Sequence, residues 1–222
     1  MQIESREKIC YHRTRICAGA VLSSQKNLPF AKRHHRREMR WSVQIRLLGE
    51  FSVIDRGTPV EGLQHARLQS LLANLIVHHE APQSRARIAF ALWPDHTDKQ
   101  AQTNLRNTLF RLRRALPDAD AYLVSTRELL GWRQDAPADV DLIAFDESLV
   151  IAEGARSLKN VEQERGALEC AVANYRGELL PDLYDEWVLK AREGYRLDLL
   201  ETLGRLMDLA EHAKDYGAAM SW

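Results

Sequence analysis

One stretch of the sequence, residues 97–117, concentrates side chains that can recognise nucleic acid. It holds five cationic side chains, and no acidic residue lies between Asp98 and Asp118. The five are Lys99, Arg106, Arg111, Arg113 and Arg114. Arg and Lys bind phosphates or guanine edges, Asn and Gln pair with adenine, and Phe contacts the methyl group of thymine. This composition indicates a surface suited to double-stranded DNA.

A helix is needed to position these side chains. Thr97 and Gln100 form a capping-box pattern at its start, and Pro117 stops the pattern after Leu116. At about 100° per residue, one narrow apolar side collects Ala101, Leu105, Leu109, Leu112 and Leu116. The centre of the opposite side collects Gln100, Thr103, Asn107, Phe110 and Arg114, with the other four cations at its edges. We therefore expect the cationic side to face solvent.

A merely solvated helix surface is the alternative explanation of this pattern. Surface helices usually mix both charge signs, because opposite charges at i and i+4 stabilise one another. The lack of acidic residues favours DNA binding. The helix taken by itself, however, is also explained by a basic, solvated face with one exposed aromatic side chain.

A short hairpin is predicted directly after this helix. Residues 122–126 and 129–133 have the pattern of two strands joined around Arg127 and Glu128. Strands, three helices and a terminal hairpin make up a winged helix-turn-helix. In that architecture the third helix enters the major groove, and the hairpin, here through Arg127, reaches the neighbouring backbone or minor groove.

The elements in front of the helix complete this architecture. Alternating apolar residues over 43–60 predict two or three short antiparallel strands. Helical spacing over 68–76 predicts the first helix, and Ser84 is placed to cap a short second helix that ends before Pro94.

The segments described so far resemble those of a known family. The segment LWPDHTDKQAQTNLRNTLFRLRRALP (92–117) is similar to the OmpR-like DNA-binding domain of SARP-type transcriptional activators, as are LLGEFSV (47–53) and the helix around Arg67 and Leu71. The resemblance implies base-reading roles for part of the third helix: Arg106, Asn107, Phe110 and Arg111. It implies phosphate contacts for Arg113 and Arg114, and Thr103 and Arg127 complete the expected DNA-binding set.

The resemblance continues beyond the hairpin and covers about residues 43–222. YRGELLPD (175–182) and DEWV (185–188) are similar to the start of the bacterial transcriptional activator domain of that family. The family implies that the protein reads tandem direct repeats near promoters and recruits RNA polymerase holoenzyme. Because one module of this size buries only about 600–1,000 Å² on DNA, we expect a homodimer on the repeats. Phe110 departs from the polar or basic residue common in the family, so the base preference stays open.

The rest of the chain is predicted to be helical. No strand pattern follows Arg133, while helical spacing predicts helices over 141–153, closed by Gly154, over 158–175 and beyond Pro181. Paired helices of this kind resemble tetratricopeptide repeats, whose concave faces bind partners. The sequence stops at Trp222, just after a helix restarts at 218, so we expect this domain to be truncated.

Charge is distributed unevenly, although the chain totals 31 basic and 31 acidic residues. Residues 1–40 hold 10 Lys and Arg against 3 Asp and Glu, residues 41–135 hold 12 against 10, and residues 136–222 hold 9 against 18. We expect a disordered basic extension over 1–40, an OmpR-like winged-helix domain over 41–135 and a bacterial transcriptional activator domain over 140–222. The predicted fold class is mostly α with a small β part, namely an α+β winged helix-turn-helix followed by an all-α, tetratricopeptide-like domain.

Composition and motifs argue against other classes of protein. No stretch reaches the ~20 apolar residues of a membrane helix, so we expect no membrane partner. No phosphate-binding loop, G-x-S-x-G, H-E-x-x-H or zinc-finger spacing occurs, so we expect no enzymatic activity, cofactor or metal. Three cysteines without a C-x-x-C pair favour the cytoplasm. The alternative to a DNA-binding regulator is a tetratricopeptide-like scaffold that binds protein without specific DNA binding.

Overall fold

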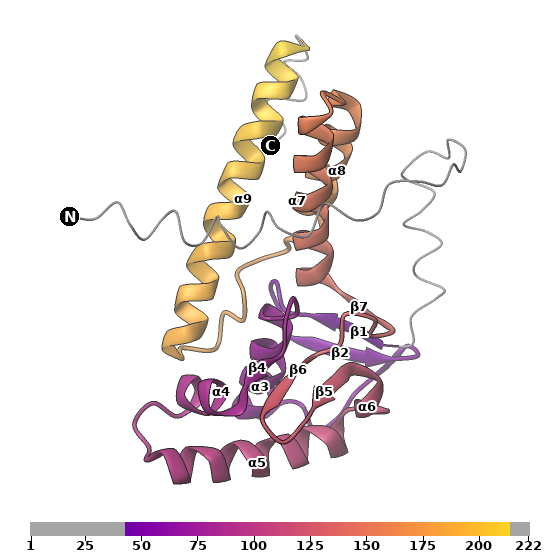
Figure 1. Cartoon of the computed structure of the whole chain (residues 1–222). Coiled ribbons are helices and arrows are strands. Elements are labelled where there is room, and N and C mark those ends of the chain that lie inside the picture. Colours follow the sequence, from indigo (N-terminus) through magenta and orange to yellow (C-terminus); the bar gives the residue numbers. More distant parts are fainter. Residues whose placement is uncertain (1–42, 214–222) are drawn as a thin grey trace, which may run out of the picture. The chain divides into compact units, whose positions relative to one another are not determined.

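The computed structural model describes residues 43–213; the disordered extension expected over 1–40 and the helix expected to restart at 218 lie outside them. The first elements are β1 (Val43–Arg46), β2 (Ser52–Asp55), β3 (Thr58–Pro59), α3 (Ala66–Val77), β4 (Gln83–Ser84), α4 (Arg85–Leu92) and α5 (Asp98–Ala115). They are followed by α6 (Ala119–Tyr122), β5 (Leu123–Ser125), β6 (Leu129–Trp132), β7 (Ala138–Val140), α7 (Asp141–Ser157), α8 (Val161–Asn174) and α9 (Glu186–His212) (Figure 1).

The first sheet has the strand order β3-β2-β1-β7. β1 pairs antiparallel with β2, where Ile45 lies opposite Val53, and both side chains are buried. β7 corrects the expectation that no strand follows Arg133, because it pairs parallel with β1. Three residues are too few to display the alternation of a strand, and their partner lies far away in the sequence, so local pattern does not reveal them.

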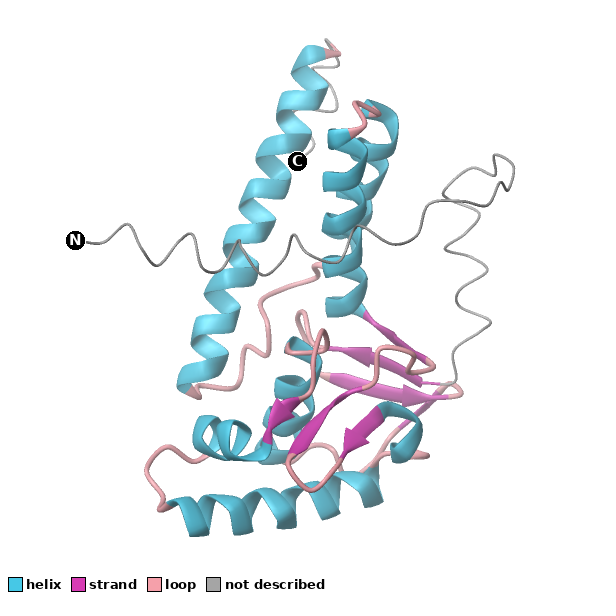
Figure 2. Ribbon diagram, viewed as in Figure 1, coloured by secondary structure: helices cyan, strands magenta, loops and turns pink. Residues whose placement is uncertain are grey.

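The second sheet, β4-β6-β5, contains the predicted hairpin, which is confirmed (Figure 2). Leu123 lies opposite Trp132, and the rings of Tyr122 and Trp132 stack with centroids 5.7 Å apart. Gly131 permits the hairpin to approach the chain before α4, since a Cβ at this residue would come within 2.7 Å of the Pro82 Cα. The hairpin is therefore packed closely on the segment that leads into α4.

The three predicted helices of this part are confirmed as α3, α4 and α5. The Ser84 Oγ accepts a hydrogen bond from the Arg87 N–H at 3.2 Å, and the Thr97 Oγ1 accepts one from the Gln100 N–H at 3.4 Å. α5 packs on α3 and α4. The whole predicted apolar side of α5 is buried: Ala101, Leu105, Leu109, Leu112 and Leu116.

The later helices are α7, α8 and α9, and the first of them runs past its expected end. Gly154, which was expected to close α7, stays helical, and α7 continues to Ser157. Lys159 takes the left-handed conformation instead, with φ 56°, and the Asn160 N–H donates to the Ala155 carbonyl oxygen at 2.9 Å. This arrangement is a Schellman end, which satisfies the last carbonyl groups of the helix without a glycine.

One hydrophobic core contains residues from both predicted domains. Leu179, Val188 and Tyr195 join the same buried cluster as Leu72 and Leu105. At the start of α9 the Asp185 carboxylate pairs with the Arg67 guanidinium of α3 at 2.7 Å. The same guanidinium donates to the carbonyl oxygen of Leu92, at the end of α4, at 3.1 Å. α9 is therefore attached to the helices that carry α5.

The YRGELLPD segment crosses the end of β1. The Gly49 N–H donates to the Glu178 carbonyl oxygen at 2.9 Å, and the Leu180 N–H donates to the Leu47 carbonyl oxygen at 3.0 Å. A Cβ on Gly177 would lie only 3.0 Å from the Gly49 Cα. A side chain at 177 would therefore push the two segments apart.

The Asp141 carboxylate lies at the same junction, where β7 becomes α7. It accepts hydrogen bonds from the N–H groups of Leu47 at 3.0 Å, Leu48 at 3.0 Å and Leu142 at 2.7 Å. Burial raises the pKa of this carboxyl, and the three N–H groups oppose that rise. A single side chain thus satisfies two buried backbone donors just beyond β1 and one at the start of α7.

Replacing Asp141 with Ala should lower the free energy of unfolding by about 3 kcal/mol, because the buried N–H groups of Leu47 and Leu48 lose their acceptor. Asp139→Ala is the matched control, since it removes a partly exposed ion pair with Arg46 at 2.7 Å that is worth less than about 1 kcal/mol. Urea unfolding followed by tryptophan fluorescence measures both variants. Equal losses in the two would contradict the role given to Asp141.

Candidate nucleic-acid interface

The outer side of α5 faces solvent. α5 lies beyond α4 and away from α7, α8 and α9 (Figure 1). Seven of the eight predicted contact residues are exposed: Arg106, Asn107, Phe110, Arg111, Arg113, Arg114 and Arg127. Thr103 is half-buried, and Phe110 exposes 61% of its surface. The structure therefore brings the α5 residues together on one accessible surface, which we call the contact face.

Helical geometry divides the contact face into a centre and two edges. At about 100° per residue, Arg106 and Arg113 fall on one edge and Arg111 falls on the other, with Asn107 between Arg111 and the centre line. The centre line holds Thr103, Phe110 and Arg114. The two edges differ in chemistry, because one is purely cationic and the other also carries an amide.

Polar side chains near the start of α5 are bonded within the helix. The Gln100 side-chain amide departs from the predicted capping box, since it donates to the Asn104 Oδ1 at 3.0 Å instead of returning to Thr97. The Thr103 hydroxyl donates to the Lys99 carbonyl oxygen at 2.9 Å. The Thr103 oxygen keeps its capacity to accept a hydrogen bond from a ligand.

Arg85, at the start of α4, holds the hairpin, and sequence analysis missed it. Its Nε donates to the Thr126 carbonyl oxygen at 2.9 Å, and its Nη2 donates to the Ser125 Oγ at 2.8 Å. Its backbone N–H donates to the Glu128 carbonyl oxygen at 2.9 Å. The partners of Arg85 lie about 40 residues further along the chain, so no local sequence pattern could have indicated that Arg85 binds the hairpin.

The Arg85 guanidinium also belongs to a cluster of positive charge. Partial burial lowers the pKa of Arg85, and the positive charges of Arg113 and Arg106 lower it further. The cationic edge of the contact face is therefore the edge near the hairpin. Guanidinium groups held close together attract an anionic ligand such as a phosphate.

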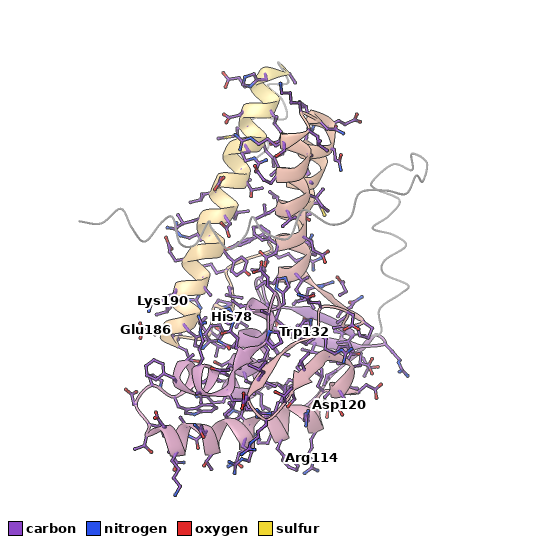
Figure 3. The ribbon with its side chains drawn as sticks, in the orientation of Figure 1. His78, Arg114, Asp120, Trp132, Glu186 and Lys190 are labelled. Atoms are coloured by element: carbon purple, nitrogen blue, oxygen red, sulfur yellow. The ribbon has the colours of Figure 1, made fainter. Side chains whose placement is uncertain are left out.

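Two cations near the end of α5 have partners within the chain. The Arg113 Nη2 lies 3.2 Å from the Asp120 Oδ1 of α6. The Arg114 guanidinium lies over the Phe110 ring, 5.8 Å from its centroid. Both Arg114 and Asp120 are marked in Figure 3. The Asp120 side chain is 89% exposed, and an exposed ion pair of this kind is worth no more than about 1 kcal/mol, so a phosphate can replace it.

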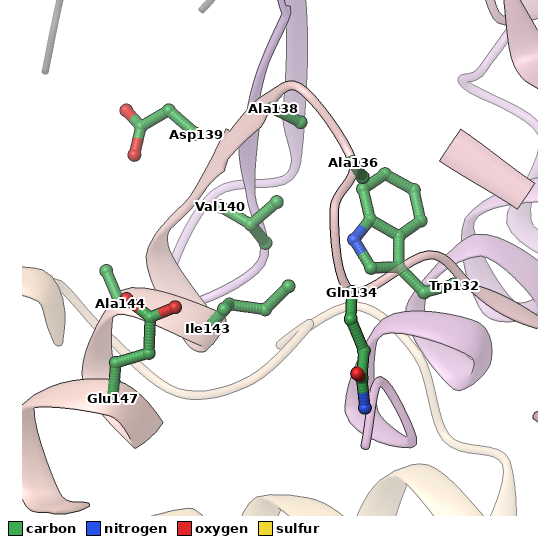
Figure 4. A pocket seen from close by; sticks show the side chains of 9 residues that line it. All are labelled: Trp132, Gln134, Ala136, Ala138, Asp139, Val140, Ile143, Ala144 and Glu147. Atoms are coloured by element: carbon green, nitrogen blue, oxygen red, sulfur yellow. The ribbon is translucent and has the colours of Figure 1, made fainter. Parts of the chain in front are cut away.

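Away from the contact face, other features of the described residues do not form a comparable site. A cavity of about 80 Å³ lies between Trp132 and the start of α7 (Figure 4), whereas small-molecule pockets measure about 300–1,000 Å³. Asp139 on its wall is already paired with Arg46. Over residues 43–213, no three His, Cys, Asp or Glu side chains are placed to share a metal ion. Within the same range no helix combines the length and apolar character needed to cross a bilayer.

Comparison with known proteins defines the fold. EmbR from Mycobacterium tuberculosis, solved in complex with a low-affinity phosphopeptide, matches with a TM-score of 0.67 at 20% sequence identity. The chain shares its fold with EmbR. The match covers 81% of this chain and 48% of the EmbR chain, so the chain spans about half the length of EmbR. No protein-family model matches the sequence, and no curated protein matches it. The predicted fold class, a small β part with a winged helix followed by helices, is confirmed.

Arg85→Ala should loosen the hairpin and leave the core intact. Because two side-chain hydrogen bonds are lost, the N–H groups of residues 125–129 should exchange with solvent about fivefold faster, the effect of roughly 1 kcal/mol. Arg87→Ala is the matched control, since Arg87 is an exposed arginine on the same helix. Unchanged exchange in the Arg85 variant would show that this side chain does not hold the hairpin.

Proposed function

We propose that the protein is a sequence-specific DNA-binding transcriptional regulator whose helix α5 enters the major groove. The observation that carries the proposal is the contact face, which is exposed, cationic and free of acidic residues after Asp98. The major groove of B-DNA is about 12 Å wide and admits one α-helix. The resemblance to SARP-type activators and the fold shared with EmbR are in keeping with it.

Each residue of the contact face receives a role. We assign base contacts to Arg106, Asn107, Phe110 and Arg111, and phosphate contacts to Arg113 and Arg114. Arg127 at the tip of the hairpin reaches the adjacent backbone or minor groove. The Thr103 oxygen accepts a hydrogen bond from a base, and Arg85 adds its charge between α5 and the hairpin.

We further propose that the regulator is an activator. In this scheme residues 41–135 bind DNA, and residues 140–222 contact RNA polymerase holoenzyme. Residues 136–222 hold 18 acidic against 9 basic residues, which suits protein and repels DNA. α9 also exposes four large apolar side chains: Leu189, Leu197, Leu200 and Met207. Exposed apolar surface of this kind marks sites of protein interaction.

Two copies on tandem direct repeats complete the proposal. A single DNA-binding module of this size buries about 600–1,000 Å², whereas specific protein–DNA interfaces bury about 1,000–2,500 Å² of protein surface. Binding of a second copy to an adjacent repeat reaches that range. The homodimer is thus a consequence of interface size and of the resemblance.

Selection from a random pool of duplexes tests the function as a whole. The wild-type protein should enrich duplexes that contain a direct repeat, and its affinity should fall steeply with salt, by a log–log slope of about −0.9 for each neutralised phosphate. A tetratricopeptide-like scaffold would enrich no sequence and show no such slope.

Single substitutions should separate phosphate contacts from base contacts. Arg113→Ala should weaken binding to all duplexes alike and reduce the salt slope by about one. Asp120→Asn controls for the carboxylate that this change leaves unpaired. Asn107→Ala and Arg111→Ala should each cost about 1–3 kcal/mol on the selected duplex and relax one base position. If both of these variants bind the selected duplex as the wild type does, the base-reading assignment is wrong.

A further inference from the structure

Phe110 and Arg114 form a pair at the centre of the contact face. Phe110 keeps 61% of its surface exposed, and the Arg114 guanidinium lies over its ring. Scattered exposed apolar side chains are ordinary on protein surfaces. Phe110, however, occupies the middle of a polar, cationic surface, so an apolar partner for its ring would have to come from the ligand.

The ring limits the freedom of the arginine. Attraction between the guanidinium and the face of the ring holds Arg114 in one region before any ligand arrives. A guanidinium that is already oriented loses less entropy when it forms two directed hydrogen bonds. Paired hydrogen bonds of this kind can go to a phosphate or to the O6 and N7 atoms of a guanine, and the Phe110 ring beneath the guanidinium favours the major groove, where thymine methyl groups lie.

The position of Phe110 and Arg114 on α5 also favours a base contact for Arg114. Arg113 lies on the edge near the hairpin and pairs with Asp120 at 3.2 Å, whereas Phe110 and Arg114 lie on the centre line that faces the groove floor. Four residues rise about 6 Å along a helix, and neighbouring base pairs are about 3.4 Å apart. A spacing of about 6 Å is just under two base-pair steps, so the two side chains can contact base pairs that lie one or two steps apart.

We propose that Phe110 and Arg114 together read a thymine that lies one or two base pairs from a guanine. Phe110 contacts the C5-methyl group of the thymine, and Arg114 donates two hydrogen bonds to the O6 and N7 atoms of the guanine. This inference rests on the proposed function and deepens it by naming the two bases that are read. It moves Arg114 from a phosphate contact to a base contact.

The test replaces thymine by deoxyuridine, which lacks only the C5-methyl group. Wild-type protein first selects duplexes from a random pool, and failure at this stage defeats the proposed function itself. Each thymine of the selected duplex is then exchanged singly for deoxyuridine. One exchange, one or two base pairs from a guanine, should weaken binding about fourfold, the effect of one buried methyl group.

Variants of Phe110 and Arg114 show which of the two residues is responsible for the fourfold loss of affinity. Phe110→Ala should bind the thymine and deoxyuridine duplexes equally well, and Arg114→Gln should lose the preference for that guanine. Phe110→Leu should retain discrimination of the methyl group, because its side chain stays apolar. Phe90→Ala is the matched control: Phe90 is 68% exposed on α4, outside the contact face, and its removal should preserve the fourfold difference.

Two results would overturn the inference while leaving the proposed function in place. In the first, wild-type protein binds its selected duplex but tolerates deoxyuridine at every position. In the second, Phe110→Ala still distinguishes thymine from deoxyuridine, so the methyl group is read by another residue.

Discussion

Burial along one side of α5 fixes the rotation of that helix about its axis. The four leucines and Ala101 on this side are each at most 5% exposed. Rotating the helix by a quarter turn would expose them, at about 1.5–3 kcal/mol for each leucine, and would bury arginines without partners. The contact face consequently has to face solvent. Its chemistry follows from the residues on it, because α5 carries no acidic residue after Asp98, and the Asp120 carboxylate that pairs with Arg113 is exposed and replaceable.

The hairpin and the later helices are attached to the elements that carry α5 by side chains from distant parts of the sequence. Arg85 binds the hairpin turn and places a third guanidinium near Arg106 and Arg113. Asp141 and Asp185 tie α7 and α9 to the sheet and to α3. The acidic helical part therefore shares a core with the winged helix, while α5 lies beyond α4 and away from α7, α8 and α9 (Figure 1). This arrangement separates a surface suited to a polyanion from a surface suited to protein.

Sequence pattern was sufficient wherever an element is long and periodic. The caps at Ser84 and Thr97, the stop at Pro117 and the buried stripe were all predictable, because each depends on residues within one or two turns. β7 and the bonds of Arg85 were not predictable, since they depend on pairing across 40 residues or more. Gly154 misled the prediction of where α7 ends, because a helix can close on a left-handed Lys159 when the following residues satisfy its carbonyl groups. The roles of the contact-face residues stay predictions, as a fold at 20% identity does not test them.

A nuclear magnetic resonance titration of the protein with its selected duplex tests the central claim most directly. The largest changes in backbone amide shifts should map to α5 and to the hairpin turn at 125–129, with α7, α8 and α9 changing little. Changes concentrated on α9, with α5 unaffected, would contradict the claim that this helix contacts DNA.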